Sequence, residues 1–443
     1  MSACRKIDCS SQNCILFVIL SLSLDITLLS FFSGWLATTH GRARKVHLAG
    51  VIITSCLVSF LLFCLGKAYR RKVKEDVKVA IDSSKDSEVD AEFLASLSGL
   101  PTRFSFKDLE SATSGFSRKL GRGGFGSVYF GSLADGSEIA VKRLEKGGHG
   151  QKEFCAEVDI ISRVRHANLV CMKGFCVEGA ERLLVYEYMP RGSLERWIFH
   201  EEMQVSSLSH DLASPSGFLV LNWDIRYRIA VETARGLAYL HEECEEAILH
   251  LDVKPQNILL DERFHAKVSD FGLSRSMDRA QSRLVTTVRG TPGYLAPEWF
   301  SEGGIGVKTD VYGYGMLVLE LVSGRRSVDQ MQDDIEDWFL PAMAFRKLKE
   351  NRAVDVIDPL LQGKVDALTF LTEALTTIRV ALWCIQEDAS KRPSMSSVVQ
   401  MLEGKMKVTE PPLSRNFLAG RRLRNDPHTS ITIIDDESLT LPR

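Results

Sequence analysis

The sequence of 443 residues contains no Cys-x-x-Cys pair and no Asn-x-Ser/Thr sequon, although it has ten cysteines. Without paired cysteines, neither a zinc site nor a secreted disulfide framework is indicated. Single cysteines instead fit reduced thiols inside the cell. The missing sequon means that nothing marks a glycosylated ectodomain. The formal net charge is −2, so the charge balance argues neither for nor against a nucleic-acid partner.

A long apolar stretch without charge covers residues 48–66. At roughly 1.5 Å per residue it is just long enough to span a hydrocarbon core of about 30 Å. We predict a transmembrane helix here, because a basic cluster after an apolar span is a stop-transfer signal that leaves the following chain in the cytoplasm. The cluster comprises Lys67, Arg70, Arg71, Lys72 and Lys74.

An earlier apolar stretch at 15–37 carries Asp25, whose charge costs roughly 2.5–3.5 kcal/mol in a membrane. Residues 1–37 are therefore either a signal peptide, with Arg5 and Lys6 at its start, or a first membrane span. Trp35 makes the cleavage site near Ala37 weak. The ten residues at 38–47 form a short extracytoplasmic loop in either case. They are too few to fold, so we expect no ligand-binding ectodomain in this chain.

Two further segments flank the expected folded domain at 114–404. Residues 67–113 are predicted to be a juxtamembrane linker, flexible at 82–90, where Ser and Asp are frequent. Apolar residues at helical spacing predict a helix within Phe104–Phe116. Residues 405–443 have the composition of a disordered tail.

A Gly-x-Gly-x-x-Gly pattern occurs at 120–128, and it is a weak signal by itself. Dinucleotide-binding folds place a helix after these glycines. Here the residues that follow predict a strand, a turn at Asp135-Gly136 and a second strand at Glu138–Leu144. Glycines in such a hairpin let backbone N–H groups approach phosphates. The candidate nucleotide-binding residues are Leu120, Gly121, Arg122, Gly123, Gly124, Phe125, Gly126, Ser127 and Val128.

Lys142 closes the second strand, where a lysine would usually be solvated. After a glycine-rich hairpin we interpret it instead as the cation for the α- and β-phosphates. It then needs a carboxylate, and the amphipathic run 151–164 offers Glu157 and, as the competing candidate, Glu153. We favour Glu157 because the apolar residues around it indicate that its side of the helix faces the protein interior.

The strand 182–194 breaks at Pro190 and contains the candidate adenine-binding positions Glu187 and Met189, whose backbone groups would meet the base. Tyr186 would guard the back of that pocket. An ordinary edge strand is compatible with the same residues.

Residues 250–261, HLDVKPQNILLD, gather an acid, a base and an amide. The carboxylate of Asp252 can accept a proton from an attacking hydroxyl, and Lys254 can contact the transferred phosphate. The amide oxygen of Asn257 can hold Mg²⁺. Asp270, in Ser-Asp-Phe-Gly, follows at the spacing expected of a second metal ligand.

Six motifs in order across 114–404 resemble those of protein kinases. The chain is most similar to plant receptor-like kinases of the S-domain/lectin-receptor branch, including a subgroup with almost no ectodomain. The segments LGRGGFGSVY, LVYEYMPRGSL and GTPGYLAPEW carry this resemblance. It implies a two-lobed α+β fold with a β-rich N-lobe and a helical C-lobe, ATP with Mg²⁺ or Mn²⁺, and protein serine or threonine substrates. It further implies a plasma-membrane protein with a cytoplasmic kinase domain, a ligand-binding receptor or co-receptor as partner, and no nucleic acid.

Leu251 departs from the resemblance, because the family usually has arginine before the catalytic aspartate, where it binds a phosphorylated activation-segment residue. Leucine cannot do so, and we predict activity that is largely independent of activation-segment phosphorylation. The alternative is a pseudokinase scaffold or co-receptor, although no catalytic position is substituted. The activation segment offers as phosphate acceptors Ser274, Ser276, Ser282, Thr286 and Thr287.

Two structural contacts are also expected from the resemblance. Asp310 should brace the catalytic loop from a central helix, and Arg392 should pair with Glu298. The segment Gly290–Tyr294 should cradle the acceptor hydroxyl.

Overall fold

The computed structural model describes residues 66–67, 71–72 and 101–412, with gaps at 124–125, 146–147, 200–220, 282, 302–303, 329–336 and 362–366. The chain divides into two units, Met1–Lys85 and Asp86–Arg443. In the first unit the described residues are helical and exposed.

In the part of the chain that the structure describes, no helix is long and apolar enough to cross a bilayer. The apolar stretches at 15–37 and 48–66 lie outside the described residues, apart from Gly66. So do the loop 38–47, most of the linker 67–113 and the tail from residue 413. The predictions for these segments stay predictions.

The second unit begins with a six-stranded sheet in the order β1-β5-β6-β4-β3-β2. Neighbouring strands are antiparallel, except that β1 and β5 are parallel. The predicted hairpin is confirmed, because β3 and β4 pair along their whole length from Gly126 opposite Leu144 to Ser132 opposite Glu138. The strands are β1 (Thr102–Arg103), β2 (Lys119–Gly123), β3 (Gly126–Ser132), β4 (Glu138–Leu144), β5 (Met172–Glu178) and β6 (Glu181–Glu187).

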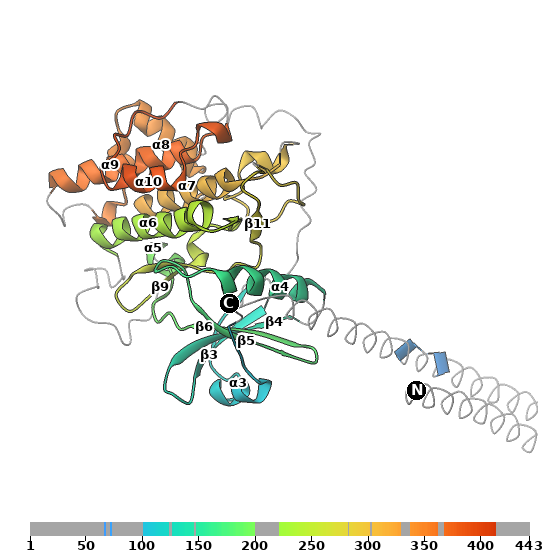
Figure 1. The fold of residues 1–443 in the computed structure, drawn as a ribbon. Helices are drawn as coiled ribbons and strands as arrows, with labels where there is room; N and C mark the ends of the chain where they lie inside the picture. The colour runs from blue at the N-terminus through green and yellow to red at the C-terminus, as the bar shows by residue number, and fades with distance from the viewer. Residues whose placement is uncertain are drawn as a thin grey trace, which may run out of the picture. The chain divides into compact units, whose positions relative to one another are not determined.

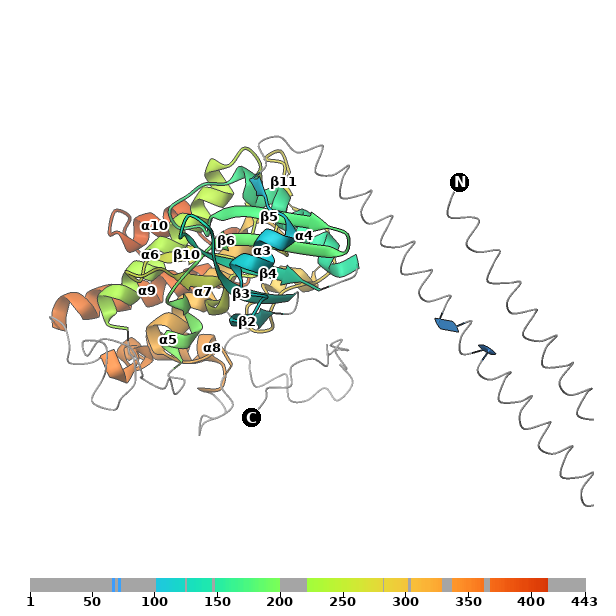
Figure 2. The same ribbon diagram turned by 90° about the horizontal axis from the view of Figure 1, so that it is seen from below.

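Successive side chains of a strand point to opposite faces, so this sheet has side chains to pack on both faces. One helix covers each face. On one face, Ile139 and Val141 of β4 pack with Leu109 of α3 (Phe106–Ala112). The other face packs against Phe154 and Val158 of α4 (Gly148–Arg163). Figure 1 shows α3 and α4 on either side of the strands, and in Figure 2, seen from below, α3 lies in front of them. The helix expected within 104–116 is therefore confirmed as α3.

The rest of the second unit is mainly helical and is built around α7 (Val307–Ser323), whose residues are buried from Thr309 to Ser323. A helix that is apolar on all sides belongs at the centre of a lobe. It ends at Gly324, whose φ of +66° gives a left-handed cap. The other helices are α5 (Glu195–Ile198), α6 (Trp223–Ala238), α8 (Leu340–Lys349), α9 (Ala367–Cys384) and α10 (Met395–Leu402).

Two small sheets lie at the lobe boundary and carry the loops of the site. One has the order β10-β9-β7 and the other pairs β11 with β8. The two-lobed α+β fold predicted from the sequence is confirmed (Figure 1). These strands are β7 (Gly192–Ser193), β8 (Ala247–Leu249), β9 (Ile258–Leu260), β10 (Ala266–Val268) and β11 (Arg275–Met277).

Candidate active site

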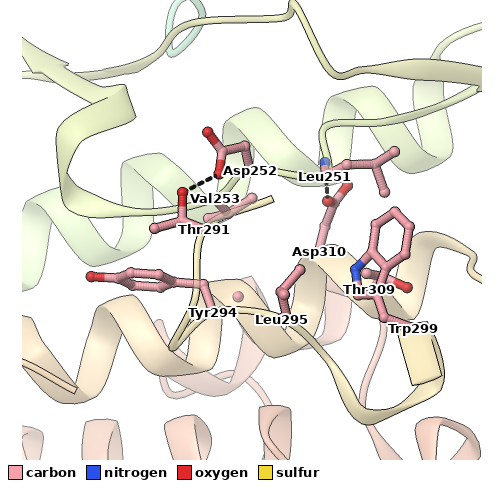
Figure 3. A pocket seen from close by; sticks show the side chains of 10 residues that line it. Leu251, Asp252, Val253, Thr291, Tyr294, Leu295, Trp299, Thr309 and Asp310 are labelled. Carbon is pink, nitrogen blue, oxygen red and sulfur yellow. Dashed lines mark hydrogen bonds between the residues drawn. The ribbon is translucent and has the colours of Figure 1, made fainter. Parts of the chain in front are cut away.

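The loop between β8 and β9 is held from below by Asp310 of α7 (Figure 3). The backbone N–H groups of His250 and Leu251 donate to its two carboxylate oxygens, each at 2.7 Å. His241 Nε2 lies 2.8 Å from the same carboxylate. Burial opposes ionisation of Asp310, but the contacts with His241 and His250 hold its pKa below the usual value. The predicted brace from Asp310 is confirmed.

Asp252 stands at the centre of a polar network. Thr291 Oγ1 donates to Asp252 Oδ1 at 2.8 Å and accepts from Lys254 Nζ at 2.6 Å. Lys254 Nζ also lies 2.8 Å from Asp252 Oδ2. Asn257 Nδ2 donates to the Asp252 backbone oxygen and to Oδ2, at 2.8 and 2.9 Å. The carboxylate of Asp252 therefore already accepts a hydroxyl hydrogen, with an ammonium group beside that hydroxyl.

Asn257 and Asp270 retain oxygens that suit a hard divalent cation. Both partners of the Asn257 amide are oxygen acceptors, so its NH₂ must face Asp252, which leaves the amide oxygen for another partner. Asp270 uses Oδ1 to accept from Lys142, and its side chain is 33% exposed. Burial opposes ionisation of Asp270, whereas Lys142 keeps its pKa below the usual value. Amide and carboxylate oxygens are the ligands that Mg²⁺ prefers, so the two residues fit such an ion.

Lys142 lies at the lobe interface and contacts three carboxylates. Its Nζ is 2.8 Å from Asp270, 2.9 Å from Glu153 and 3.0 Å from Glu157. Burial favours the neutral amine, but the carboxylates raise the pKa of Lys142 well above its usual value. The predicted pair of Lys142 and Glu157 is confirmed, and Glu153, the competing candidate, reaches the lysine as well.

Glu153 and Glu157 differ in their second partners. Tyr186 of β6 donates its hydroxyl to Glu157. Glu153 Oε2 is buried and has no hydrogen-bond partner among the described residues. Burial raises the pKa of Glu153 to about 8, and burial also raises the pKa of Glu157.

The glycine-rich hairpin of β2 and β3 lies next to β4. A Cβ at Gly126 would meet the Arg143 backbone oxygen at 2.2 Å, so the strands can approach only because this residue is glycine. At Gly121 and Gly123 a Cβ would meet nothing within 4 Å, which leaves open space beside them. Val128 is paired with Lys142 in the ladder. Of the other candidates, Leu120, Arg122 and Ser127 lie in these strands, and Gly124 and Phe125 lie outside the described residues.

The candidate hinge follows β6. The Glu187 N–H donates to Cys171 O at 3.0 Å, and the Glu187 carboxylate accepts from Lys267 at 2.8 Å. The carbonyl of Met189 accepts from Gly192 N–H at 3.0 Å, and no described residue accepts from the Met189 N–H. The Met189 N–H is therefore a backbone donor without a partner among the described residues, at a position predicted to meet adenine.

The activation segment is anchored at its end and exposed in its middle. Arg392 donates two hydrogen bonds to Glu298, at 2.7 and 2.8 Å, which confirms the predicted pair. Thr286 and Thr287 are exposed. Ser274 is buried and donates to His250 O at 3.2 Å, so it is not an accessible phosphate acceptor.

Two contacts escaped the sequence interpretation. The bond from Thr291 to Asp252 joins loops 39 positions apart. The Tyr186–Glu157 bond joins β6 to α4. Glu153 was expected only as the competitor of Glu157, although residues four apart on a helix share a face, and that spacing was the signal that both carboxylates could reach Lys142.

A glycine-rich hairpin, a buried lysine held by carboxylates, and an aspartate that accepts a hydroxyl hydrogen beside a second lysine together define a site for phosphoryl transfer. Residues 115–402 match the family described as Protein kinase domain. The chain therefore belongs to the protein kinase family, as the sequence predicted.

Relatives place it further among receptor-like serine/threonine-protein kinases. It is 48% identical over 377 residues to the G-type lectin S-receptor-like serine/threonine-protein kinase SD2-5 of Arabidopsis thaliana, covering 85% of this chain and 43% of that protein. It is 39% identical to LECRK1 of Oryza sativa subsp. japonica, a G-type lectin S-receptor-like kinase, over 94% of this chain and 49% of the relative. A "probable receptor-like protein kinase" of Arabidopsis thaliana is 41% identical, over 82% of this chain and 80% of its own length. The chain thus spans less than half of the two G-type lectin relatives.

Proposed function

We propose that this chain is a membrane-anchored serine/threonine protein kinase that transfers the γ-phosphate of ATP to protein serine and threonine hydroxyls. One observation carries the proposal. The hydroxyl of Thr291 donates to Asp252 and accepts from Lys254, which is the pair of contacts that a substrate hydroxyl needs before attack. A substrate hydroxyl would take the place of Thr291 as the donor to Asp252, or share that carboxylate with it.

Each residue of the site has a role in this scheme. Asp252 orients the acceptor hydroxyl and takes its proton, and Lys254 stabilises charge on the transferred phosphoryl group. Lys142, anchored by Glu157, positions the α- and β-phosphates. Asn257 and Asp270 would hold the metal. Mg²⁺, or Mn²⁺ in its place, would neutralise charge on the phosphates. The hairpin residues 120–128 would cover the nucleotide, and the backbone of Glu187 and Met189 would meet adenine.

The kinase is proposed to be of the non-arginine type at Leu251. The side chain of Leu251 is buried and lines the same pocket as Leu295 and Trp299 of the activation segment (Figure 3). An apolar pocket lining of this kind is independent of phosphorylation. It supports a catalytic loop that is positioned without a phosphate on Thr286 or Thr287.

Membrane anchoring is proposed from the uncharged stretch at 48–66 and the basic residues that follow it. The names of the relatives, which are receptor-like kinases, support a plasma-membrane location with the kinase domain in the cytoplasm. A ligand-binding receptor or co-receptor in the same membrane would then be its partner. Protease protection of an N-terminal tag in sealed vesicles would give the topology before residue 48.

Phosphate transfer from radiolabelled ATP tests the enzymatic proposal. We expect the purified full chain to label itself and an added protein on serine and threonine. In an Asp252→Asn variant the rate should fall by about 10²–10³-fold. Asp224→Asn, at an exposed position at the start of α6, is the matched control and should keep the wild-type rate. Equal labelling by the wild type and Asp252→Asn would reject the proposal and favour a scaffold without chemistry.

A further inference from the structure

All three N–H donors of Lys142 are engaged by carboxylates. Its Nζ lies within 3.0 Å of Glu153, Glu157 and Asp270. A lysine ammonium group has three donors, so none is left for a phosphate. A nucleotide that uses Lys142 must therefore displace at least one of these carboxylates.

The three carboxylates differ in what else holds them. Glu157 also accepts from Tyr186, which keeps it in place when Lys142 turns away. Asp270 is partly exposed and has a second task at the proposed cation site. The Glu153 side chain is only 3% exposed, and among the described residues its one polar contact is with Lys142. Its second carboxylate oxygen is buried without a partner among the described residues.

The position of the Glu153 carboxylate depends on a glycine from another element. A Cβ at Gly272 would lie 2.4 Å from Glu153 Oε1, 2.6 Å from Cγ and 2.9 Å from Cδ. These are the three nearest atoms, so alanine at 272 would collide first with one flexible side chain. Gly272 does not have a positive φ, so its backbone accepts alanine. Residue 272 therefore offers a way to displace the Glu153 carboxylate without altering residue 153.

We propose that Glu153 competes with the phosphates of ATP for Lys142 and thereby lowers the affinity of the site for ATP. Glu153 acts through Lys142 as a positioning residue and does not touch the nucleotide. The inference rests on the proposed function, because it takes Lys142 as the lysine that binds the phosphates.

Calorimetric binding of a non-hydrolysable ATP analogue with Mg²⁺ to the full chain tests the inference. We expect Glu153→Gln to bind the analogue about three- to tenfold more tightly than the wild type. Glu157→Gln should bind the analogue more weakly, because it removes the carboxylate that stays in place beside Lys142 when the lysine turns to the phosphates. Glu110→Gln, at an exposed position of α3, should match the wild type. In steady-state assays Glu153→Gln should lower KM for ATP and leave kcat nearly unchanged, whereas a structural defect would lower kcat.

The variant Gly272→Ala gives a second, independent route. It should tighten binding as Glu153→Gln does, and it should have no further effect in a Glu153→Ala background, because residues that act through one contact are not additive. Unchanged or weaker binding by Glu153→Gln, or an effect of Gly272→Ala that persists without Glu153, would overturn the inference.

Binding separates this inference from the proposed function. If the wild type binds the analogue but transfers no phosphate from ATP, the proposed function fails while the affinities still decide the role of Glu153. If neither the wild type nor the variants bind the analogue at millimolar concentration, the inference fails as well.

Discussion

The N–H of Leu251 donates to Asp310 Oδ1 at 2.7 Å, and Leu251 has a φ of +67°. A left-handed conformation costs a residue other than glycine roughly 1–2 kcal/mol. The Asp310 carboxylate offsets this cost, because it accepts hydrogen bonds from two successive N–H groups, Leu251 at Oδ1 and His250 at Oδ2. Asp252 follows this strained turn directly. The Asp310 carboxylate and the catalytic carboxylate of Asp252 are therefore coupled through two peptide units.

We therefore expect Asp310→Asn to lower both stability and turnover. The amide would place an NH₂ group opposite a backbone N–H, and one buried donor would lose its acceptor at a cost of about 1–3 kcal/mol. The thermal midpoint and kcat of the purified chain measure the two effects. A variant with wild-type kcat would show that the brace does not position Asp252.

The pair of Arg392 and Glu298 should contribute far more to stability than an exposed pair. The Arg392 side chain is 0% exposed, and Glu298→Gln would leave its charge buried without a carboxylate. We expect the free energy of unfolding to fall by about 3–5 kcal/mol. Glu410→Gln breaks the exposed pair with Arg379 and should change it by less than about 1 kcal/mol. Similar losses in the two variants, measured by chemical denaturation, would contradict this assignment.

Glu320 of α7 should make stability depend on pH near neutrality. Burial raises its pKa to about 7, although bonds from Tyr294 and Ser327 favour the ionised form. Because the folded pKa lies above the unfolded value, the contribution to stability is complete below pH 4.5 and is lost as the pH rises through 7.

The measurement is the free energy of unfolding from pH 5 to pH 8 for the wild type and Glu320→Gln. The wild type should lose on the order of 3 kcal/mol more than the variant over this range. Parallel curves would show that folding does not shift the pKa of Glu320.

The sequence predicted the parts of the fold that depend on local pattern. The strand at Glu138–Leu144 was predicted with its observed bounds, because its alternation of side chains is a local signal. Lys142 and Glu157 were matched through the apolar face of α4, which is also local. The spacing of Asp252, Lys254 and Asn257 within one loop carried the catalytic assignment.

Contacts between distant segments could not be predicted in this way. The position of the Glu153 carboxylate depends on Gly272, and no sequence periodicity links these two positions. The two-residue strand β1 is too short to give a pattern, and it is defined only by its pairing with β5. The left-handed turn at Leu251 depends on a carboxylate 59 positions away.

The phosphotransfer site proposed for this chain should be complete without a phosphorylated activation segment. The most direct test is the turnover of the Thr286→Ala, Thr287→Ala double variant on an added protein substrate, with Asp252→Asn as the inactive reference. Both threonines are exposed, so their loss should leave the fold unchanged and turnover within about threefold of the wild type. A fall of about a hundredfold or more would show that a phosphate on this segment is required and would contradict the role assigned to Leu251.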